Sequence, residues 1–510
     1  MTLPARMRCT AAAFVLVLAA AGCAPKSAPP ATIVRSWFAG HAQPAFDPDG
    51  PPDALRWALE RALSRGLVEL DTTGVPRPAA AESYAWSDDS LALTFRLRAD
   101  LRYTDGTPVT SADFAAALTA GLARTDHASR EWLLAAVTGL DKVRAGRPIP
   151  RLGIETPEPA TLVLRLSRRD PRLLERLALP GVATPWRART GTWAEAVGLG
   201  PYRVAAAEGD RVLVFVRADS LAPARALADT LRVRFGSGAP RVRTPLRAGE
   251  ADLVWPLPPA LLEQPLPAGY AARSRAASPV RRLLLLFRAD MPPTTKLPAR
   301  HALAHATSRA DLVEALGPAG QESATWLPGG GPFEFPRFDE DEMRAWLARG
   351  KLGASFHVVL AYDADGTGAA VARALQGTWA RVGLYAEMRP LRGAAAAAQP
   401  LLSAAAHAQL VEEQALLTGP EAELAGLVMP VRGPAVGSFR SGWRTREFDP
   451  WVARTDAAVP LDAVRAQARL SEERLALPIA LLPWQWVERN TGEIARFHPR
   501  FGPEWAADRD

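Results

Sequence analysis

Histidine is the residue type from which many metal sites are built, and this chain places two histidines four residues apart. His301 and His305 would lie on one face of a helix, which is the spacing of a metal-binding pair. A zinc hydrolase motif with this spacing carries glutamate directly after the first histidine, where this chain has Ala302. The remaining histidines are isolated in sequence, so we predict no metal site.

Neighbouring carboxylates are the second group that could do chemistry. Glu412 and Glu413, or the run 339–341, have the residue types for acid–base work on a glycoside, but charge runs are normally solvated. The chain has no G-x-S-x-G motif, and the glycines at 329–331 are not followed by the Lys-Ser/Thr of a phosphate loop. We predict no catalytic residue and no cofactor, and hence not an enzyme.

Aromatic usage is uneven, with 15 tryptophans against 6 tyrosines. Tryptophan can stack on a ligand in a cleft, although most of these side chains are expected to pack in a core.

The N-terminus has the pattern of a secretory signal peptide. Arg6 and Arg8 precede an apolar stretch over 11–21, which small residues follow. The stretch 18–23 resembles a bacterial lipobox, whose cysteine, here Cys23, would take a diacylglycerol; Ala20 stands where leucine is more usual.

Cysteine usage supports lipidation. Cys9 lies inside the signal peptide and Cys23 at its end, so the exported body would keep no thiol for a disulfide or a nucleophile. We predict a signal peptide over 1–22, a lipidated Cys23 and a Pro/Ala/Ser-rich tether over 23–32. The alternative is cleavage elsewhere, with Cys23 left as a stray thiol.

Composition excludes several classes of protein. The 510 residues are 48% hydrophobic and 23% charged, as in globular proteins, and no apolar run of about 18 residues occurs beyond the N-terminus. The formal charge is +7, and removal of Arg6 and Arg8 with the signal peptide lowers it to +5. The basic residues are scattered among acids, so we predict no nucleic-acid partner.

The elements predicted from periodicity mix strands and helices. Alternation predicts strands, and spacing of three and four predicts helices. A capping box at Thr110 and Asp113 opens one of the helices. The strands are expected at 33–38, 91–98, 161–166, 212–216, 231–235 and 384–388, and the helices at 54–63, 110–118, 303–313 and 371–382. This mixture predicts an α/β architecture.

Several segments in the same order resemble the signature of extracellular solute-binding protein family 5, the peptide- and nickel-type receptors of ABC importers. The strongest block ends in the sequence YTDGTPVTSADF at 103–114, and a GLGPY turn lies at 198–202. The remaining segments are 66–71, 78–84, 86–89, 93–98, 248–252, 300–306 and 375–383. The resemblance covers residues 31–488 and is strongest in the first half.

The resemblance implies a two-lobed periplasmic-binding-protein fold (type II, large peptide-binding subclass) with an extra domain and a ligand cleft between the lobes. The lobes would close on a small solute, which could be a peptide, and deliver it to an ABC permease; a monomer is expected. The implied divisions are 33–62, 198–275 and 489–510 for lobe I, 63–197 for the extra domain and 276–488 for lobe II.

The chain also departs from the family. Members that bind peptides carry a W-x-x-D-Y-x-x-P segment, whose carboxylate pairs with the peptide's amino group. The equivalent stretch here, 411–420, has neither the tryptophan nor the aspartate. Ser308 replaces a usual aspartate and Arg65 a usual glutamate, which are expected to affect helix capping and packing.

The predicted ligand contacts are Trp37, Trp326, Glu413, Gln414 and Trp486, with Glu413 placed to replace the missing carboxylate. Three alternatives remain open: a receptor for a non-peptide solute, a sensory or interaction protein without transport, and an extracytoplasmic hydrolase.

Overall fold

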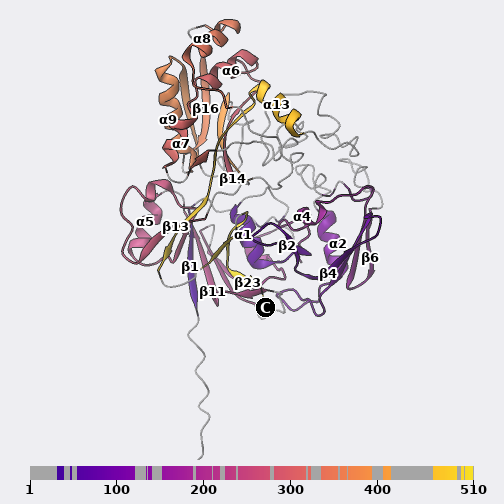
Figure 1. The fold of residues 1–510 in the computed structure, drawn as a ribbon. Coiled ribbons are helices and arrows are strands. Elements are labelled where there is room, and N and C mark those ends of the chain that lie inside the picture. The colour runs from indigo at the N-terminus through magenta and orange to yellow at the C-terminus, as the bar shows by residue number, and fades with distance from the viewer. Residues whose placement is uncertain are drawn as a thin grey trace, which may run out of the picture.

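The structure is a computed structural model in which two lobes lie one above the other, with a third sheet beside the lower lobe (Figure 1). The residues that it describes are 32–39, 46, 48, 54–120, 134, 136–139, 152–187, 191–208, 211–218, 224–236, 239–275, 281–317, 320–322, 335–353, 356–364, 366–392, 406–414, 463–490, 495–498 and 500–508.

Lobe I, the lower lobe, is built on a seven-stranded sheet in the order β13-β20-β12-β1-β11-β9-β8. Its central strand β1 (Ile33–Phe38) pairs in parallel with β11 (Thr230–Phe235) and β12 (Leu253–Trp255). The outer strands pair antiparallel and are β8 (Tyr202–Glu208), β9 (Val212–Arg217), β13 (Tyr270–Arg275) and β20 (Trp484–Arg489).

Helices cover both faces of this sheet. On one face, α1 (Ala54–Leu63) buries Leu55 and Leu59, spaced to share a helix face, against Phe215 and Trp255. On the other face, α5 (Ala239–Arg247) packs with the 3₁₀ helix η4 (Pro259–Leu261) in a cluster with Val254 and Val487.

Lobe II, the upper lobe, is built on a six-stranded sheet in the order β15-β19-β14-β18-β16-β17. All seven residues of β14 are buried, as expected for a central strand covered on both faces. The strands are β14 (Arg281–Phe287), β15 (Gln321–Glu322), β16 (His357–Asp363), β17 (Tyr385–Leu391), β18 (Ala408–Gln414) and β19 (Ala476–Leu481). The helices are α6 (Leu297–His305), α7 (Arg309–Leu316), α8 (Glu340–Arg349), α9 (Gly368–Arg381) and α13 (Ala463–Glu473).

A four-stranded sheet, in the order β4-β5-β7-β6, forms a side domain with its own buried core. Trp57 of α1 and Phe501 near the C-terminus belong to this core, so the side domain is packed onto lobe I. Its elements are β2 (Val68–Leu70), β3 (Pro76–Pro78), β4 (Ala81–Trp86), β5 (Ala92–Leu97), α2 (Ser111–Ala120), β6 (Ile154–Glu158), β7 (Thr161–Arg165) and α4 (Leu173–Leu177).

The C-terminal residues return to lobe I. The hydroxyl of Tyr202 donates a hydrogen bond to the carbonyl of Trp505 (3.0 Å) and accepts one from the amide of Ala228 (3.1 Å). The remaining short elements are η3 (Trp193–Glu195), β10 (Ala224–Ala226), β21 (Arg496–His498), β22 (Gly502–Glu504) and β23 (Ala506–Asp508), where β10 pairs with β23 and β21 with β22.

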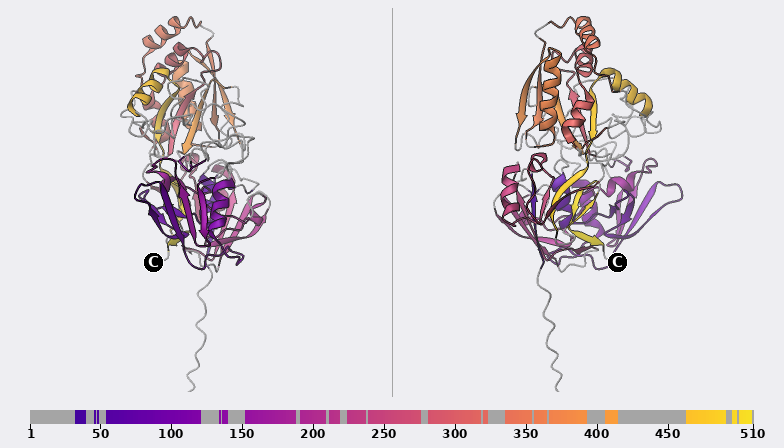
Figure 2. Two further views of the ribbon diagram at one scale, coloured as in Figure 1. Left: turned by 90° about the vertical axis from the view of Figure 1, so that its right-hand side faces the viewer. Right: turned by 60° about the vertical axis from the view of Figure 1, so that its left-hand side comes forward.

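Two crossings join the described strands of the lobes. β13 of lobe I precedes β14 of lobe II, and β19 of lobe II precedes β20 of lobe I, with only Leu482 and Pro483 between them. The crossings lie side by side, because β13 pairs with β20 and β14 pairs with β19. The strand that passes between the lobes is visible at the waist of the molecule (Figure 2).

The structure confirms the predicted two-lobed α/β fold class and most of the predicted elements. The strand at 33–38 and the helix at 54–63 have the predicted bounds, and the other strands differ by a few residues at their ends. At α2, one half of the predicted capping box is present, because the carboxylate of Asp113 accepts a hydrogen bond from the backbone amide of Thr110 (2.7 Å). The Thr110 hydroxyl donates to the same carboxylate (2.9 Å) instead of accepting from the Asp113 amide, which bonds to the Thr110 carbonyl (3.1 Å). The predicted helix 303–313 is divided by a cap, where Ser308 accepts a hydrogen bond from the amide of Asp311 and begins α7.

Candidate ligand-binding site

The end of β18 lies where lobe II meets the crossings. In the antiparallel register of β14 and β18, Glu413 pairs with Arg282, and Gln414 pairs with Arg281. Arg281 is the first residue of β14 after the crossing from lobe I, so the two predicted ligand residues Glu413 and Gln414 lie at the strand end that adjoins the interlobe connection. Their side chains lie outside the described part of the structure.

Arg281 makes contacts in both lobes. Its Nη1 donates a hydrogen bond to the carbonyl of Pro483 (2.7 Å), and its Nη2 forms an ion pair with Glu412 of β18. The guanidinium carbon lies 4.0 Å from the ring centroid of Trp484, which belongs to the buried core of lobe I. The Arg281 side chain is only 8% exposed, so these contacts form in a largely desolvated position.

Trp486 lies in β20, two residues beyond Trp484. Its ring stacks on Phe497 at a centroid distance of 3.7 Å, and its indole N–H donates to the carboxylate of Glu488 (2.9 Å). The side chain is half-buried against the core that contains α1.

Trp37 lies in β1 on the other face of the same sheet. It pairs with Val254, whose neighbour in β20 is Val487, and all three belong to the cluster under α5. Trp486, one residue before Val487 in β20, therefore points to the opposite face. The structure does not bring Trp37 and Trp486 onto one face of the sheet.

A cavity of about 150 Å³ lies beside Trp37 on its face of the sheet. Its lining residues are Arg35, Ser36, Trp37, Arg232, Arg234, Glu250 and Ala251. Each of the three arginines faces a carboxylate: Arg35 pairs with Asp252 (2.7 Å), Arg232 with Glu208 (3.0 Å) and Arg234 with Glu250 (3.5 Å).

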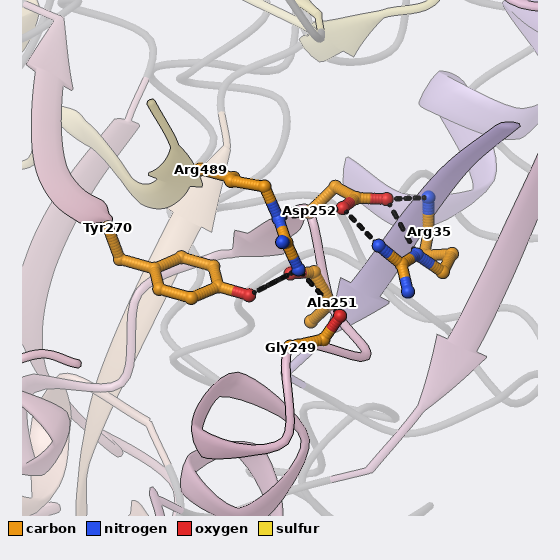
Figure 3. A network of polar contacts seen from close by, with 6 residues as sticks. All are labelled: Arg35, Gly249, Ala251, Asp252, Tyr270 and Arg489. Atoms are coloured by element: carbon orange, nitrogen blue, oxygen red, sulfur yellow. Dashed lines mark hydrogen bonds and ion pairs between the residues drawn. The ribbon is translucent and has the colours of Figure 1, made fainter. Parts of the chain in front are cut away.

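Asp252 is the centre of a polar network at one side of this cavity (Figure 3). Its carboxylate accepts two hydrogen bonds from the guanidinium of Arg35 (2.9 and 2.7 Å) and lies 3.1 Å from Nε of Arg489. Arg489 also donates to the hydroxyl of Tyr270 (2.9 Å). The hydrogen bond to Asp252 raises the pKa of Arg35, and burial raises the pKa of Tyr270. The network joins β1, β13 and β20 to the residue that precedes β12, which indicates a structural role.

The two histidines that suggested a metal site have structural roles. The ring of His301 stacks on Trp346 and bonds to the carbonyl of Glu472 (2.9 Å), and His305 bonds to the carbonyl of Arg337 (3.2 Å). Burial lowers the pKa of His301 to about 4. Within the part of the chain that the structure describes, no group of three or more His, Cys, Asp or Glu side chains is arranged to hold a metal ion.

The carboxylate run at 339–341 begins a helix. Asp339 is the N-cap of α8 and accepts hydrogen bonds from the amides of Asp341 (3.0 Å) and Glu342 (2.9 Å). Two predicted site residues, Cys23 and Trp326, lie outside the described residues. The contacts predicted for Trp37, Trp326, Glu413, Gln414 and Trp486 remain predictions.

Arg281 is the residue that sequence reasoning missed. The segment Arg281-Arg282-Leu283-Leu284-Leu285-Leu286 opens an apolar strand with two arginines, which is a signal for buried charges that need partners. Its partners could not be read from the sequence, because Glu412 lies 131 residues away and Pro483 lies 202 residues away.

Two lobes on mixed sheets, joined by a pair of neighbouring strand crossings, define the class of two-lobed binding proteins. The sequence profile of the "Bacterial extracellular solute-binding proteins, family 5 Middle" matches residues 75–412. The chain therefore belongs to family 5 of the bacterial extracellular solute-binding proteins, as the resemblance predicted.

Named relatives agree with this assignment. The periplasmic oligopeptide-binding protein OppA of Escherichia coli K12 is 31% identical over 158 residues, which are 30% of this chain and 28% of that protein. The glutathione-binding protein GsiB of Escherichia coli O1:K1 is 24% identical over 278 residues, 53% of this chain and 51% of that protein. The matched segments thus span about half the length of these relatives or less. By name, these relatives are binding proteins for oligopeptides and for glutathione.

The solved structure of the murein tripeptide binding protein MppA of Escherichia coli has the same fold. Its TM-score is 0.77 at 16% identity, and the match covers 94% of this chain and 97% of MppA. Across the described residues, no helix has the length and apolarity that crossing a bilayer requires.

Proposed function

We propose that this chain is the solute-binding component of an ABC importer, which captures a peptide or peptide-like small solute between its lobes and delivers it to a permease. The observation that carries the proposal is the pair of adjacent crossings before Arg281 and at Leu482–Pro483, because two short neighbouring connections permit one lobe to rotate on the other. Such capture requires differential affinity of the solute for open and closed forms and no catalytic residue.

The proposed solute contacts lie near these crossings. The end of β18, with Glu413 and Gln414, adjoins the interlobe connection before β14. On the lobe I side, Trp486 lies in β20, two residues after Trp484. We keep Trp326 in the proposed site on sequence grounds. Trp37 is a weaker candidate, because it packs under α5 on the other face of the sheet.

The sequence favours two different solutes, one without and one with a free amino group. The missing tryptophan and aspartate in 411–420 favour a solute without a free peptide amino group, whereas Glu413 supplies a carboxylate at the end of β18 that can pair with one. Loss of affinity in Glu413→Gln, with unchanged folding, is expected if Glu413 binds an amino group. Unchanged affinity would exclude that role.

We further propose that Cys23 is lipidated and that residues 23–32 tether a monomeric receptor to the extracytoplasmic side of a membrane. The proposed division keeps lobe I at 33–62 and 198–275 and the extra domain at 63–197. The pairing of β20 with β12 and β13 favours a boundary at residue 483, so that lobe II is 276–483 and lobe I resumes at 484.

Native mass spectrometry tests the proposed function. Residues 24–510, produced in the periplasm, are weighed under gentle and under denaturing ionisation. A discrete extra mass that is lost on denaturation, and whose fragments give a peptide, is the expected result.

If no bound mass is found, the protein is titrated with tri-alanine and with reduced glutathione while its melting temperature is measured. A rise in melting temperature with either probe supports the proposal. No bound mass and no rise would move the assignment to a non-peptide solute or to a transport-free sensory protein, and turnover of a probe would indicate a hydrolase.

A further inference from the structure

We infer that Arg281 is a positioning residue for solute binding, which holds the two interlobe crossings together and connects them to the end of β18. The inference rests on the proposed function, because it assigns a role within lobe closure.

The first observation is that Arg281 binds the second crossing with both its side chain and its backbone. Nη1 donates to the carbonyl of Pro483 (2.7 Å), and the carbonyl of Arg281 accepts a hydrogen bond from the amide of Leu482 (2.9 Å). Leu482 and Pro483 are the only residues between β19 and β20. Since Arg281 is itself the first residue of β14, one residue joins the start of β14 to the second crossing.

The second observation is that the same guanidinium is shared between the lobes. It pairs with Glu412 in lobe II and lies over the ring of Trp484 in lobe I, and Trp484 packs at 6.4 Å from Trp255 in the lobe I core. An arginine that is 8% exposed needs such partners, because desolvation of an unpaired guanidinium is costly. A cation over an aromatic face contributes further attraction.

These contacts make a direct connection from the proposed solute site to the crossings. Glu412 immediately precedes Glu413 and Gln414 in β18, so any displacement of this strand end moves the Glu412 carboxylate that Arg281 holds. Arg281 transmits that displacement to Pro483 and Trp484. Without the guanidinium, the side-chain contacts to Pro483, Trp484 and Glu412 are lost, and lobe orientation is expected to be less restricted.

Interlobe distances measured by single-molecule fluorescence energy transfer test this role. Residues 24–510 contain no cysteine, so Thr244→Cys on α5 and Glu342→Cys on α8 give one exposed labelling site on each lobe. Arg281→Met keeps most of the apolar stem and removes the guanidinium. We expect a broader distance distribution in the solute-free protein and a roughly tenfold lower affinity for the co-purified solute or for tri-alanine.

Arg288→Met is the matched control. Arg288 directly follows β14, is 12% exposed and pairs with Asp290 (2.8 Å), far along the strand from the crossings. It is expected to change the melting temperature without changing the interlobe distribution. Arg281→Lys, which retains the charge but not the planar fork of donors, is expected to broaden the distribution as well and serves if Arg281→Met does not fold.

The inference is overturned if a folded Arg281 variant has the distance distribution of the unsubstituted protein, or if Arg288→Met broadens it equally. Failure of the proposed function has a different signature. In that case the labelled protein with Arg281 intact does not change its interlobe distance with tri-alanine or the co-purified solute. The solute-free comparison of Arg281 with its variants still decides whether this residue sets lobe orientation.

Discussion

At the scale of single residues, His498 shows how burial fixes a protonation state. Its Nε2 lies 3.2 Å and 3.0 Å from the carbonyls of Leu70 and Asp71, and its Nδ1 accepts a hydrogen bond from the amide of Arg500 (3.0 Å). This arrangement requires the neutral imidazole with its proton on Nε2. Burial, together with the nearby charge of Arg61, lowers the pKa of His498 to about 3.

The pH dependence of stability follows from this shift. The unfolded state binds the proton near pH 6.5 and the folded state only near pH 3, so the free energy of unfolding falls as the pH drops through this interval. His498 is expected to cost about 2 kcal/mol of stability between pH 7 and pH 5. Urea unfolding at both pH values measures this. Between pH 7 and pH 5, His498→Gln should lose less unfolding free energy than the unsubstituted protein, by that amount. His357→Gln, at an exposed position, is the control. Equal losses in all three proteins would contradict the prediction.

At the scale of secondary-structure elements, helix caps account for several polar residues that resembled a site. Asp339 satisfies two backbone amides at the start of α8, and the three acidic residues in the first turn, 340–342, interact favourably with the helix dipole. Asp339→Ala is expected to lower the free energy of unfolding by about 1 kcal/mol and to speed hydrogen exchange in α8. Asp341→Ala, whose side chain is 98% exposed, should have a smaller effect. Equal effects of the two substitutions would refute the capping role.

Elements with a local pattern were predictable, and contacts between distant elements were not. The alternation in β5 and the apolar spacing in α1 depend on neighbouring residues, so the sequence indicated both correctly. The contacts of Arg281 join β14, β18 and the crossing before β20, which are brought together only by the order of strands in the sheets. The opposite facing of Trp37 and Trp486 likewise depends on the register of three strands.

At the scale of the whole molecule, the tether predicted at the N-terminus leads directly into the central strand of lobe I. If Cys23 carries the lipid, Cys23→Ser is expected to move the exported protein from the membrane fraction to the soluble fraction, because a single polar substitution removes the acyl chains. Cell fractionation and the intact mass of both forms measure this. A membrane-bound Cys23→Ser protein without acyl mass would contradict the proposed lipid anchor. That outcome would not bear on the proposed solute site.

The position of β1 also sets the order in which the chain can fold during export. β1 is complete by residue 38, yet its neighbours β11 and β12 follow about two hundred residues later, and β20 follows at 484–489. Pairing across such sequence separations is slow, because the entropy cost of closing a large loop comes before any contact can offset it. A chain that is passing through a membrane channel therefore holds its first strand unpaired until about half of the chain has emerged, and the lobe I sheet can be completed only when β20, at 484–489, has emerged. The same interleaved topology that joins the lobes thus delays completion of the lobe I sheet until nearly the whole chain has emerged.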